Sequence, residues 1–171
     1  SLLAETGEKT GLNISLAFEI TDRNGEEKFE ASLNENLEAL EKYSGSHHVH
    51  PTVGMHASFT LSDDSLKKIH DAVSSLDSWG IHIHVSEDMA DEHNAADRGY
   101  GSVLERLNKF DLLNQNALII HGLHIKETDV NLIGELNAMF VHNPSSNANN
   151  RVGMTPNLNL DELGSGLGTD G

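Results

Sequence analysis

The chain of 171 residues has no cysteine, few basic residues and no long apolar run. The absence of cysteine excludes disulfides, cysteine-based zinc fingers, iron–sulfur clusters and thiol nucleophiles. Eleven Lys and Arg against 27 Asp and Glu give a formal net charge of -16. This balance disfavours nucleic-acid polymers and anionic membranes as partners, because both require a basic surface. No segment approaches the ~20 consecutive apolar residues of a membrane span, and no secretory signal follows Ser1. We expect a soluble, cytoplasmic protein.

What the chain does contain is enough apolar content for a core and an unusual number of histidines. A 37% apolar content over 171 residues suits one domain with a buried interior. The 11 His residues equal all Lys and Arg combined. Short apolar runs predict strands at 12–19, 53–59, 81–85, 117–122 and 138–141, with a weak strand at 164–171. Apolar residues at helical spacing predict helices from Ser32 to about Tyr43, from Ser62 through Leu76, at 99–113 and at 126–136, with loops at 44–51 and 145–159.

The alternation of strands and helices predicts a parallel sheet with right-handed crossovers. Two α/β architectures compete at this point: an open doubly wound sheet and a (β/α)8 barrel. A full barrel takes ~250 residues, so a barrel of this length would be incomplete.

Imidazole and carboxylate side chains gather where the predicted strands end. Ligands bind outside the carboxyl ends of the strands in both candidate folds, so this set is the candidate site. Its members are His56, His82, His84, Glu87, His121, His142 and Asp170.

Each histidine also has a simpler interpretation, because a single histidine at a strand end is usually a hydrogen-bonded structural side chain. His82 and His84 share one face of their strand, so either both chelate a metal ion or one of them packs inside. Glu87, three residues after His84, adds a carboxylate at the junction of strand and loop. Five other histidines are expected on the surface; they are His47, His48 and His50 in a Gly/Ser loop and His70 and His93 in helical or connecting segments.

Four motifs, in order, resemble the amidohydrolase superfamily: HIHVSE (82–87), IIHGLH (119–124), VHNPSSN (141–147) and GLGTDG (166–171). More narrowly, they resemble its cytosine/guanine deaminase and triazine chlorohydrolase branch. The segments EITDRNG (19–25) and GMHASFTLSD (54–63) look most like the SsnA-type aminohydrolases of that branch. The resemblance covers the whole chain and implies a (β/α)8 TIM barrel with a mononuclear metal site.

The resemblance implies a role for each site residue. His84, His121 and Asp170 would lie at the metal, with His84 and Asp170 as ligands. Asp170 would also take the first proton from the attacking water, and His121 would hydrogen-bond that water or the developing oxyanion. Glu87 would carry protons from the water to the leaving group. His56 would contact the substrate, and His142 with the loop 143–147 would shape the site.

The resemblance also implies one divalent metal ion, with zinc as the first expectation and iron as the other, since imidazole and carboxylate serve both. The family supplies two more metal ligands from an H-x-H pair on its first strand, and no such pair precedes Leu12. We therefore expect residues 1–171 to be a partial barrel that holds strands three to eight and lacks the first two strands and the family's flanking β-sandwich.

The leading hypothesis is a metal-dependent hydrolase that deaminates or dechlorinates a purine, pyrimidine or triazine-like heterocycle, although the 171 residues alone would be inactive. The alternative is an inert, incomplete barrel that acts as a binding or assembly module. A third reading is a subunit whose partner chain supplies the first strands. The open barrel edges would favour a homo-oligomer. The motifs do not identify the substrate.

Overall fold

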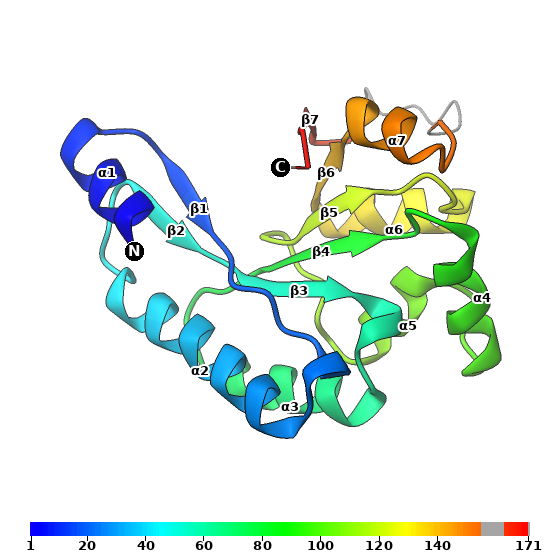
Figure 1. Cartoon of the computed structure of the whole chain (residues 1–171), viewed down its shortest axis with the longest axis horizontal. Helices are drawn as coiled ribbons and strands as arrows, with labels where there is room; N and C mark the ends of the chain where they lie inside the picture. The colour runs from blue at the N-terminus through cyan, green and yellow to red at the C-terminus, as the bar shows by residue number, and fades with distance from the viewer. Residues whose placement is uncertain (155–162, 171) are drawn as a thin grey trace.

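The computed structural model describes residues 1–154 and 163–170 and contains two parallel sheets (Figure 1). The larger sheet has five strands in the order β3-β4-β5-β6-β7, and the smaller pairs β1 with β2. The strands are β1 (Ile14–Leu16), β2 (Val49–Pro51), β3 (Val53–Ala57), β4 (Ile81–Val85), β5 (Leu118–His121), β6 (Met139–His142) and β7 (Ser165–Leu167).

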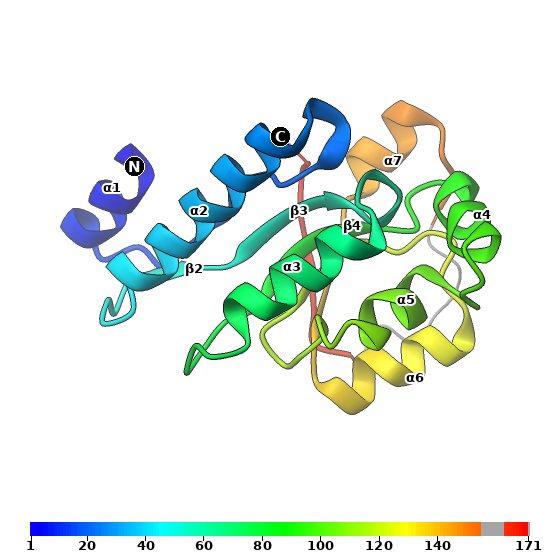
Figure 2. The same ribbon diagram turned by 90° about the horizontal axis from the view of Figure 1, so that it is seen from below.

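Helices connect the strands and form a layer beside the larger sheet (Figure 2). The helices are α1 (Leu2–Thr10), α2 (Glu26–Lys42), α3 (Asp63–Val73), α4 (Met89–Asp97), α5 (Val103–Lys109), α6 (Glu127–Leu136) and α7 (Pro144–Asn150), with short 3-10 turns η1 (Asp22–Asn24) and η2 (Ser58–Thr60). Apolar residues of α2, α3, α5 and α6 share one core cluster with residues of β3 to β6.

The alternation of side chains along β4 places apolar residues on one face of the sheet and histidines on the other. Ile81, Ile83 and Val85 are fully buried in the cluster that the helices cover. His82 and His84 point to the opposite face and are half-buried. Because successive side chains of a strand alternate between faces, one short sequence serves both purposes.

The strand order decides between the two architectures that the sequence left open. In the larger sheet, neighbours in space are also neighbours in sequence, and all pairs are parallel. A doubly wound sheet reverses its strand order and has helices on both faces, whereas a (β/α)8 barrel keeps sequential order with its helices outside. The described residues therefore form part of a barrel wall.

The predicted first strand is present and lies beside the strand that follows it. Ile14 pairs with Val49, and further along the same segment Ile20 forms a parallel bridge with Met55 of β3. Only Thr52 separates β2 from β3, so the segment from Ile14 to Ile20 accompanies both. The six predicted strands thus lie side by side in the predicted order.

Several predicted boundaries are wrong. The helix expected to begin at Ser32 begins at Glu26, after the cap residue Gly25. The loop at 44–51 contains β2, and α1 and α4 were not predicted. The loop at 145–159 begins with α7, while its residues 155–159 lie outside the described part. By contrast, α3 begins next to Ser62, close to the predicted start, and the Ser62 side chain caps it by accepting a hydrogen bond from the Ser65 backbone N–H.

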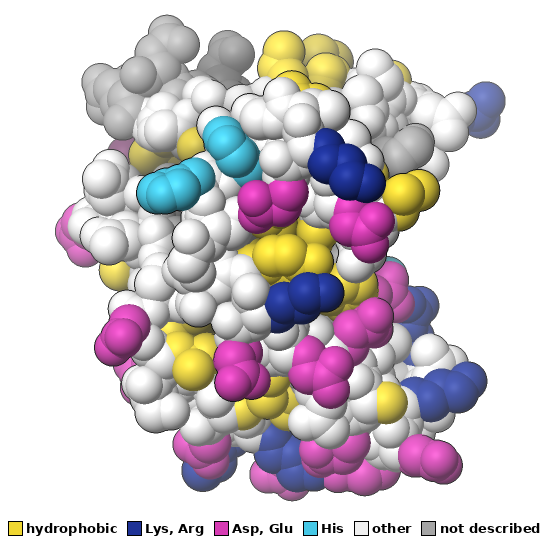
Figure 3. All heavy atoms as spheres, turned by 90° about the vertical axis from the view of Figure 1, so that its left-hand side faces the viewer, with side chains coloured by type: hydrophobic (Ala, Val, Ile, Leu, Met, Phe, Trp, Pro, Cys, Tyr) yellow, Lys and Arg dark blue, Asp and Glu magenta, His cyan; other side chains and the backbone are white. Residues whose placement is uncertain are grey.

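Acidic side chains are dispersed over one face of the molecule. Figure 3 shows Asp and Glu side chains spread over one face of the molecule and interspersed with Lys and Arg. Within the described residues, no helix is both long enough and apolar enough to cross a membrane.

Candidate metal centre

Three side chains from separate segments converge at the carboxyl ends of the strands. One nitrogen each from His84 and His121 and one carboxylate oxygen of Asp170 all lie within 4.8 Å of one another. His84 lies on β4, His121 ends β5, and Asp170 follows β7. Asp170 Oδ1 is 3.7 Å from His84 Nε2 and 3.6 Å from His121 Nε2. These three residues could hold a metal ion.

His121 is the buried member of this group, and its two ring nitrogens have different surroundings. The residue has no exposed surface. Its Nδ1 lies 2.9 Å from Oδ1 of Asn147, which comes from α7. With the amide oxygen facing the ring, Nδ1 carries the proton and donates it. Nε2 is then an acceptor that is buried and has no hydrogen-bond partner. It faces Asp170.

The carboxylates at the site are held by polar side chains of α7. Glu87 Oε2 lies 3.7 Å from His121 Nε2, and its Oε1 accepts a hydrogen bond of 3.3 Å from Asn150 Nδ2. Ser146 Oγ donates to Asp170 Oδ2 at 2.6 Å. One helix therefore orients three acidic or imidazole groups that come from three different strands.

The backbone turns sharply where these residues leave their strands. Ser86, His121 and Asp170 have φ values of 50°, 72° and 65°, in the left-handed region that non-glycine residues rarely adopt. Such strain is held only where surrounding contacts enforce it, and it is common at functional sites. Here the three strained residues lie where the chain leaves β4, β5 and β7, at the side chains of the candidate site.

Burial and neighbouring charge act on His84 in a direction that suits a metal ligand. Burial lowers its pKa below 6.5, the nearby His121 lowers it further, and the Asp170 carboxylate opposes both. A lowered pKa keeps the imidazole neutral near pH 7, so a lone pair is free.

His56 lies next to His84 and extends the group toward β3. The two ring centroids are 5.8 Å apart. Burial, followed by the charge of Arg23, lowers the pKa of His56. Its Nδ1 lies 3.3 Å from the Thr60 hydroxyl, which fixes the ring orientation.

Five of the seven residues predicted at the site are therefore close together: His56, His84, Glu87, His121 and Asp170. His82 is on the same face but is not part of the metal-binding group found among the described residues. His142 is half-buried at the end of β6, where burial and His121 lower its pKa. The sequence reasoning did not single out Asn147 or Asn150 individually. Ser146 and Asn147 lie within the loop 143–147 that was expected to shape the site. The sequence did not predict that these two side chains lie on a helix.

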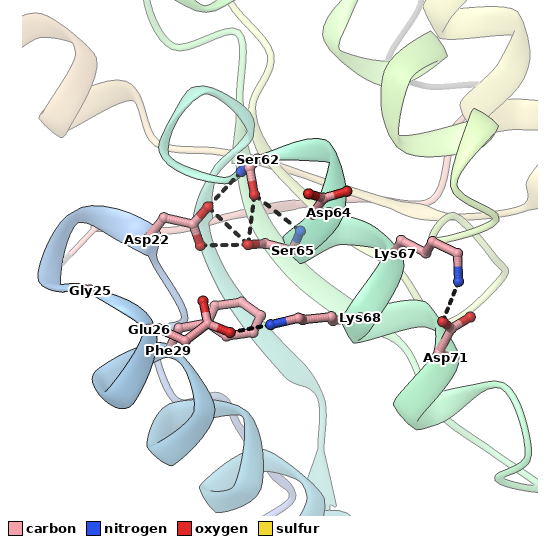
Figure 4. A pocket seen from close by; sticks show the side chains of 10 residues that line it. All are labelled: Asp22, Gly25, Glu26, Phe29, Ser62, Asp64, Ser65, Lys67, Lys68 and Asp71. Atoms are coloured by element: carbon pink, nitrogen blue, oxygen red, sulfur yellow. Dashed lines mark hydrogen bonds and ion pairs between the residues drawn. The ribbon is translucent and has the colours of Figure 1, made fainter.

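Two pockets among the described residues lie away from this group. One, of about 440 Å³, lies between the starts of α2 and α3 (Figure 4). There Asp22 accepts hydrogen bonds from the Ser62 backbone and the Ser65 hydroxyl, and Lys68 pairs with Glu26, so its polar groups satisfy one another. A second, of about 1130 Å³, is lined by residues around the opposite ends of the strands, such as Gly80 and Ala117.

The whole chain, residues 1–171, matches the model of the amidohydrolase family. It is 29% identical to 5-methylthioadenosine/S-adenosylhomocysteine deaminase 2 of Archaeoglobus fulgidus, over 99% of this chain and 41% of that protein. It is 30% identical to a 5'-deoxyadenosine deaminase of Methanococcus maripaludis, over 96% of this chain and 40% of that protein. The chain belongs to the amidohydrolase family, as the motifs predicted, and spans about 40% of the length of these curated relatives.

Solved structures confirm the fold. An adenosine deaminase from Xanthomonas campestris with bound zinc superposes with a TM-score of 0.82 at 21% identity, over 98% of this chain and 39% of that chain. An atrazine chlorohydrolase from Arthrobacter aurescens, also with zinc, gives a TM-score of 0.78 at 13% identity, over 97% of this chain and 40% of that chain. The prediction of a partial (β/α)8 barrel is confirmed. The finer resemblance to SsnA-type aminohydrolases stays a prediction.

Proposed function

We propose that this chain carries part of the active site of a metal-dependent hydrolase that removes an amino group from a heterocycle. The observation that carries the proposal is the buried Nε2 of His121, which has no hydrogen-bond partner and faces Asp170 Oδ1 at 3.6 Å beside His84. Leaving a buried acceptor unpaired is costly, whereas a cation at this point would use its lone pair. The Asn147 bond to the other ring nitrogen is the support that metal-binding histidines commonly have.

The donor set fits a divalent metal ion held by His84, His121 and Asp170. Two imidazoles and one carboxylate suit zinc and also iron. Zinc is the first choice, because the superposed adenosine deaminase and chlorohydrolase were both solved with zinc. A divalent ion supplies one kind of chemistry here: it lowers the pKa of water toward ~7, so that hydroxide is available at neutral pH.

The side chains around the metal position carry out the proton transfers and contact the substrate. Asp170 takes the first proton from the attacking water, and Glu87 carries a proton to the departing nitrogen. The bond between the ring carbon and the exocyclic amino nitrogen breaks and a C–O bond forms at the same carbon, so water and the amino-heterocycle give the oxo-heterocycle and ammonia. His121 donates from Nδ1 to Asn147 and would give its Nε2 to the ion, so it acts as a ligand, and His56 contacts the ring of the substrate. General acid–base transfer of this kind requires a carboxylate near both reacting atoms.

The substrate class follows from the relatives' names, which describe deaminases of adenosine derivatives. We therefore place an amino-purine first. Chloride replaces ammonia as the leaving group in the second candidate reaction, which the superposed chlorohydrolase suggests.

We further propose that residues 1–171 form part of a barrel domain whose remaining ligands come from outside these residues. An inert binding or assembly module is the alternative, as is a subunit completed by a partner chain or by a second copy. The unpartnered His121 nitrogen argues against an inert module, because a barrel without a metal would gain by filling that position with an apolar side chain. Stoichiometric metal in the purified chain would contradict inertness.

The test is turnover by the complete encoded polypeptide, loaded with zinc or iron, on adenosine derivatives and a chloro-triazine. Glu87→Gln should abolish ammonia release, whereas Glu135→Gln, at an exposed position of α6, should not. The proposal is wrong if the loaded protein turns over no amino- or halo-heterocycle and Glu87→Gln changes nothing.

A further inference from the structure

Two acidic residues of α4 are buried directly behind the turn that carries Glu87. Asp91 is 3% exposed and Glu92 is 7% exposed. Acidic side chains are almost never this buried unless they are paired, because desolvating a carboxylate is costly. Among the described residues, no basic side chain forms an ion pair with either acid. The groups that the two carboxylates do contact must therefore account for their burial.

Both acids bind the turn that follows β4. The Ser86 hydroxyl, which is buried, donates to Glu92 Oε1 at 2.5 Å. The backbone of Glu87 donates a hydrogen bond to the Asp91 carboxylate. Ser86 has the unusual φ of 50°, and its carbonyl accepts a hydrogen bond from His124. The two acids thus contact both residues of this turn: Ser86, where the backbone is strained, and Glu87, whose side chain lies beside His121.

The hydrogen bonds leave part of each carboxylate unused. Asp91 Oδ1 and Glu92 Oε2 are buried and have no hydrogen-bond partner. The start of α4 does not require them, because Asp88 already caps the helix by accepting a hydrogen bond of 2.8 Å from the Ala90 backbone. Apolar side chains at these two positions would fill the same space without this cost. Stability alone therefore does not account for the pair.

We propose that Asp91 and Glu92 are positioning residues that fix the Ser86–Glu87 turn and so hold the Glu87 carboxylate beside His121. The inference rests on the proposed function, since it assigns the acids a role through Glu87. Neither acid reaches the group formed by His84, His121 and Asp170, and neither touches the reacting atoms. Their contribution is the orientation of the proton-carrying side chain, 3.7 Å from His121 Nε2.

The experiment measures kcat and KM of the metal-loaded complete polypeptide with Asp91→Ala and Asp91→Asn. The alanine variant should lower kcat by about 10- to 100-fold with little change in KM, as the loss of a supporting contact typically does. The asparagine variant keeps an oxygen that accepts the Glu87 hydrogen bond and should restore kcat close to the wild-type value. Asp97→Ala, at an exposed position of the same helix, is the matched control and should change neither constant.

Two further measurements separate positioning from general damage. Combined with Glu87→Gln, Asp91→Ala should cost nothing more, because its effect passes through Glu87. The amide of Glu87 should exchange its hydrogen faster in Asp91→Ala than in Asp97→Ala, a readout that requires no substrate. If Asp91→Ala does not fold, Ser86→Ala, which removes the bond to Glu92, should lower kcat in its place.

The outcomes distinguish the two proposals. A wild-type protein without turnover defeats the proposed function. Turnover in the wild type with an unchanged kcat in Asp91→Ala defeats the positioning role, as does an equal loss in the Asn and Ala variants. A loss that persists in the Glu87→Gln background also defeats it.

Discussion

Nδ1 of His121 lies 2.9 Å from Oδ1 of Asn147, and both side chains are buried. This bond fixes the proton on Nδ1 and directs the lone pair of Nε2 toward Asp170. Asn147 therefore determines which ring nitrogen of His121 is free to bind a cation, although Asn147 lies on α7 and not on a strand.

Asn147→Ala should weaken zinc binding to the chain by about 10- to 100-fold, the usual cost of losing a partner behind a metal-binding histidine. The affinity can be measured by competition with a chromogenic chelator. Asn149→Ala, at an exposed position of the same helix, is the control and should bind like the wild type. Equal affinities in the two variants would show that the Asn147 bond does not prepare His121.

Zinc should raise the thermal stability of the chain, because a ligand that binds only the folded state stabilises it by mass action. At a free zinc concentration 100 times the Kd, the gain is about 2.7 kcal/mol. His84→Ala should remove most of the shift in Tm, whereas His93→Ala, at an exposed position of α4, should retain it. A shift that survives His84→Ala would place the bound zinc elsewhere.

Arg106→Leu should lower the free energy of unfolding by about 1 to 3 kcal/mol, because it leaves the carbonyls that the buried Arg106 satisfies without their donor. Arg106 has no exposed surface and donates to the Ser58 and Leu61 carbonyls and to Asp63 Oδ1, which fastens the loop after β3 onto α5. Urea unfolding measures the change. Lys67→Ala removes only an exposed pair with Asp71 and should cost less than about 1 kcal/mol. Similar losses for both variants would contradict the structural importance of Arg106.

The stability of the chain should carry a pH dependence that comes from Asp91. Burial raises its pKa from 3.8 to about 7, and the charges of Glu92, Glu87 and Asp88 add to this, while the Glu87 hydrogen bond opposes it. Between these two pH values the folded state binds a proton that the unfolded state has released. The free energy of unfolding should therefore fall as pH rises from about 4 to about 7, by at most about 1.4 kcal/mol per pH unit from this group.

Asp91→Asn tests this dependence, because asparagine does not titrate. The difference in stability between the variant and the wild type should grow in the variant's favour from about pH 4 to about pH 7 and then remain constant. Urea unfolding across this range provides the measurement, with Asp97→Asn as the exposed control. A difference that does not vary with pH would mean that Asp91 titrates near its ordinary value.

Much of the site could be predicted because strands obey a simple rule. Ile81, Ile83 and Val85 mark a buried face, so His84 between them must point the other way. The ends of parallel strands then lie at the same edge, which brings His84 and His121 together without knowledge of the packing. The same rule could not locate the supporting residues, since these come from helices.

Two of the helices that were not predicted, α4 and α7, have polar side chains at their buried positions. In α7 the buried residue is Asn147, so no apolar stripe marks the helix, and its Asn-rich sequence is typical of a loop. In α4 the buried residues are Asp91, Glu92 and Ala95. The early start of α2 was missed for another reason: its cap is Gly25, which makes no side-chain hydrogen bond. In α4 and α7, the misleading residues are those that support the site.

The sequential strand order has a consequence for the synthesis of the chain. Each strand of the larger sheet from β4 onward pairs with the one made just before it, so the sheet can grow in the order in which the ribosome delivers it. His84 and His121 are then in place before Asp170 emerges. A nascent chain that ends at Met154 should therefore bind zinc more weakly than the chain that includes Asp170. Because Asp170 is synthesised after His84 and His121, the chain would retain a zinc ion only after β7 has joined the sheet.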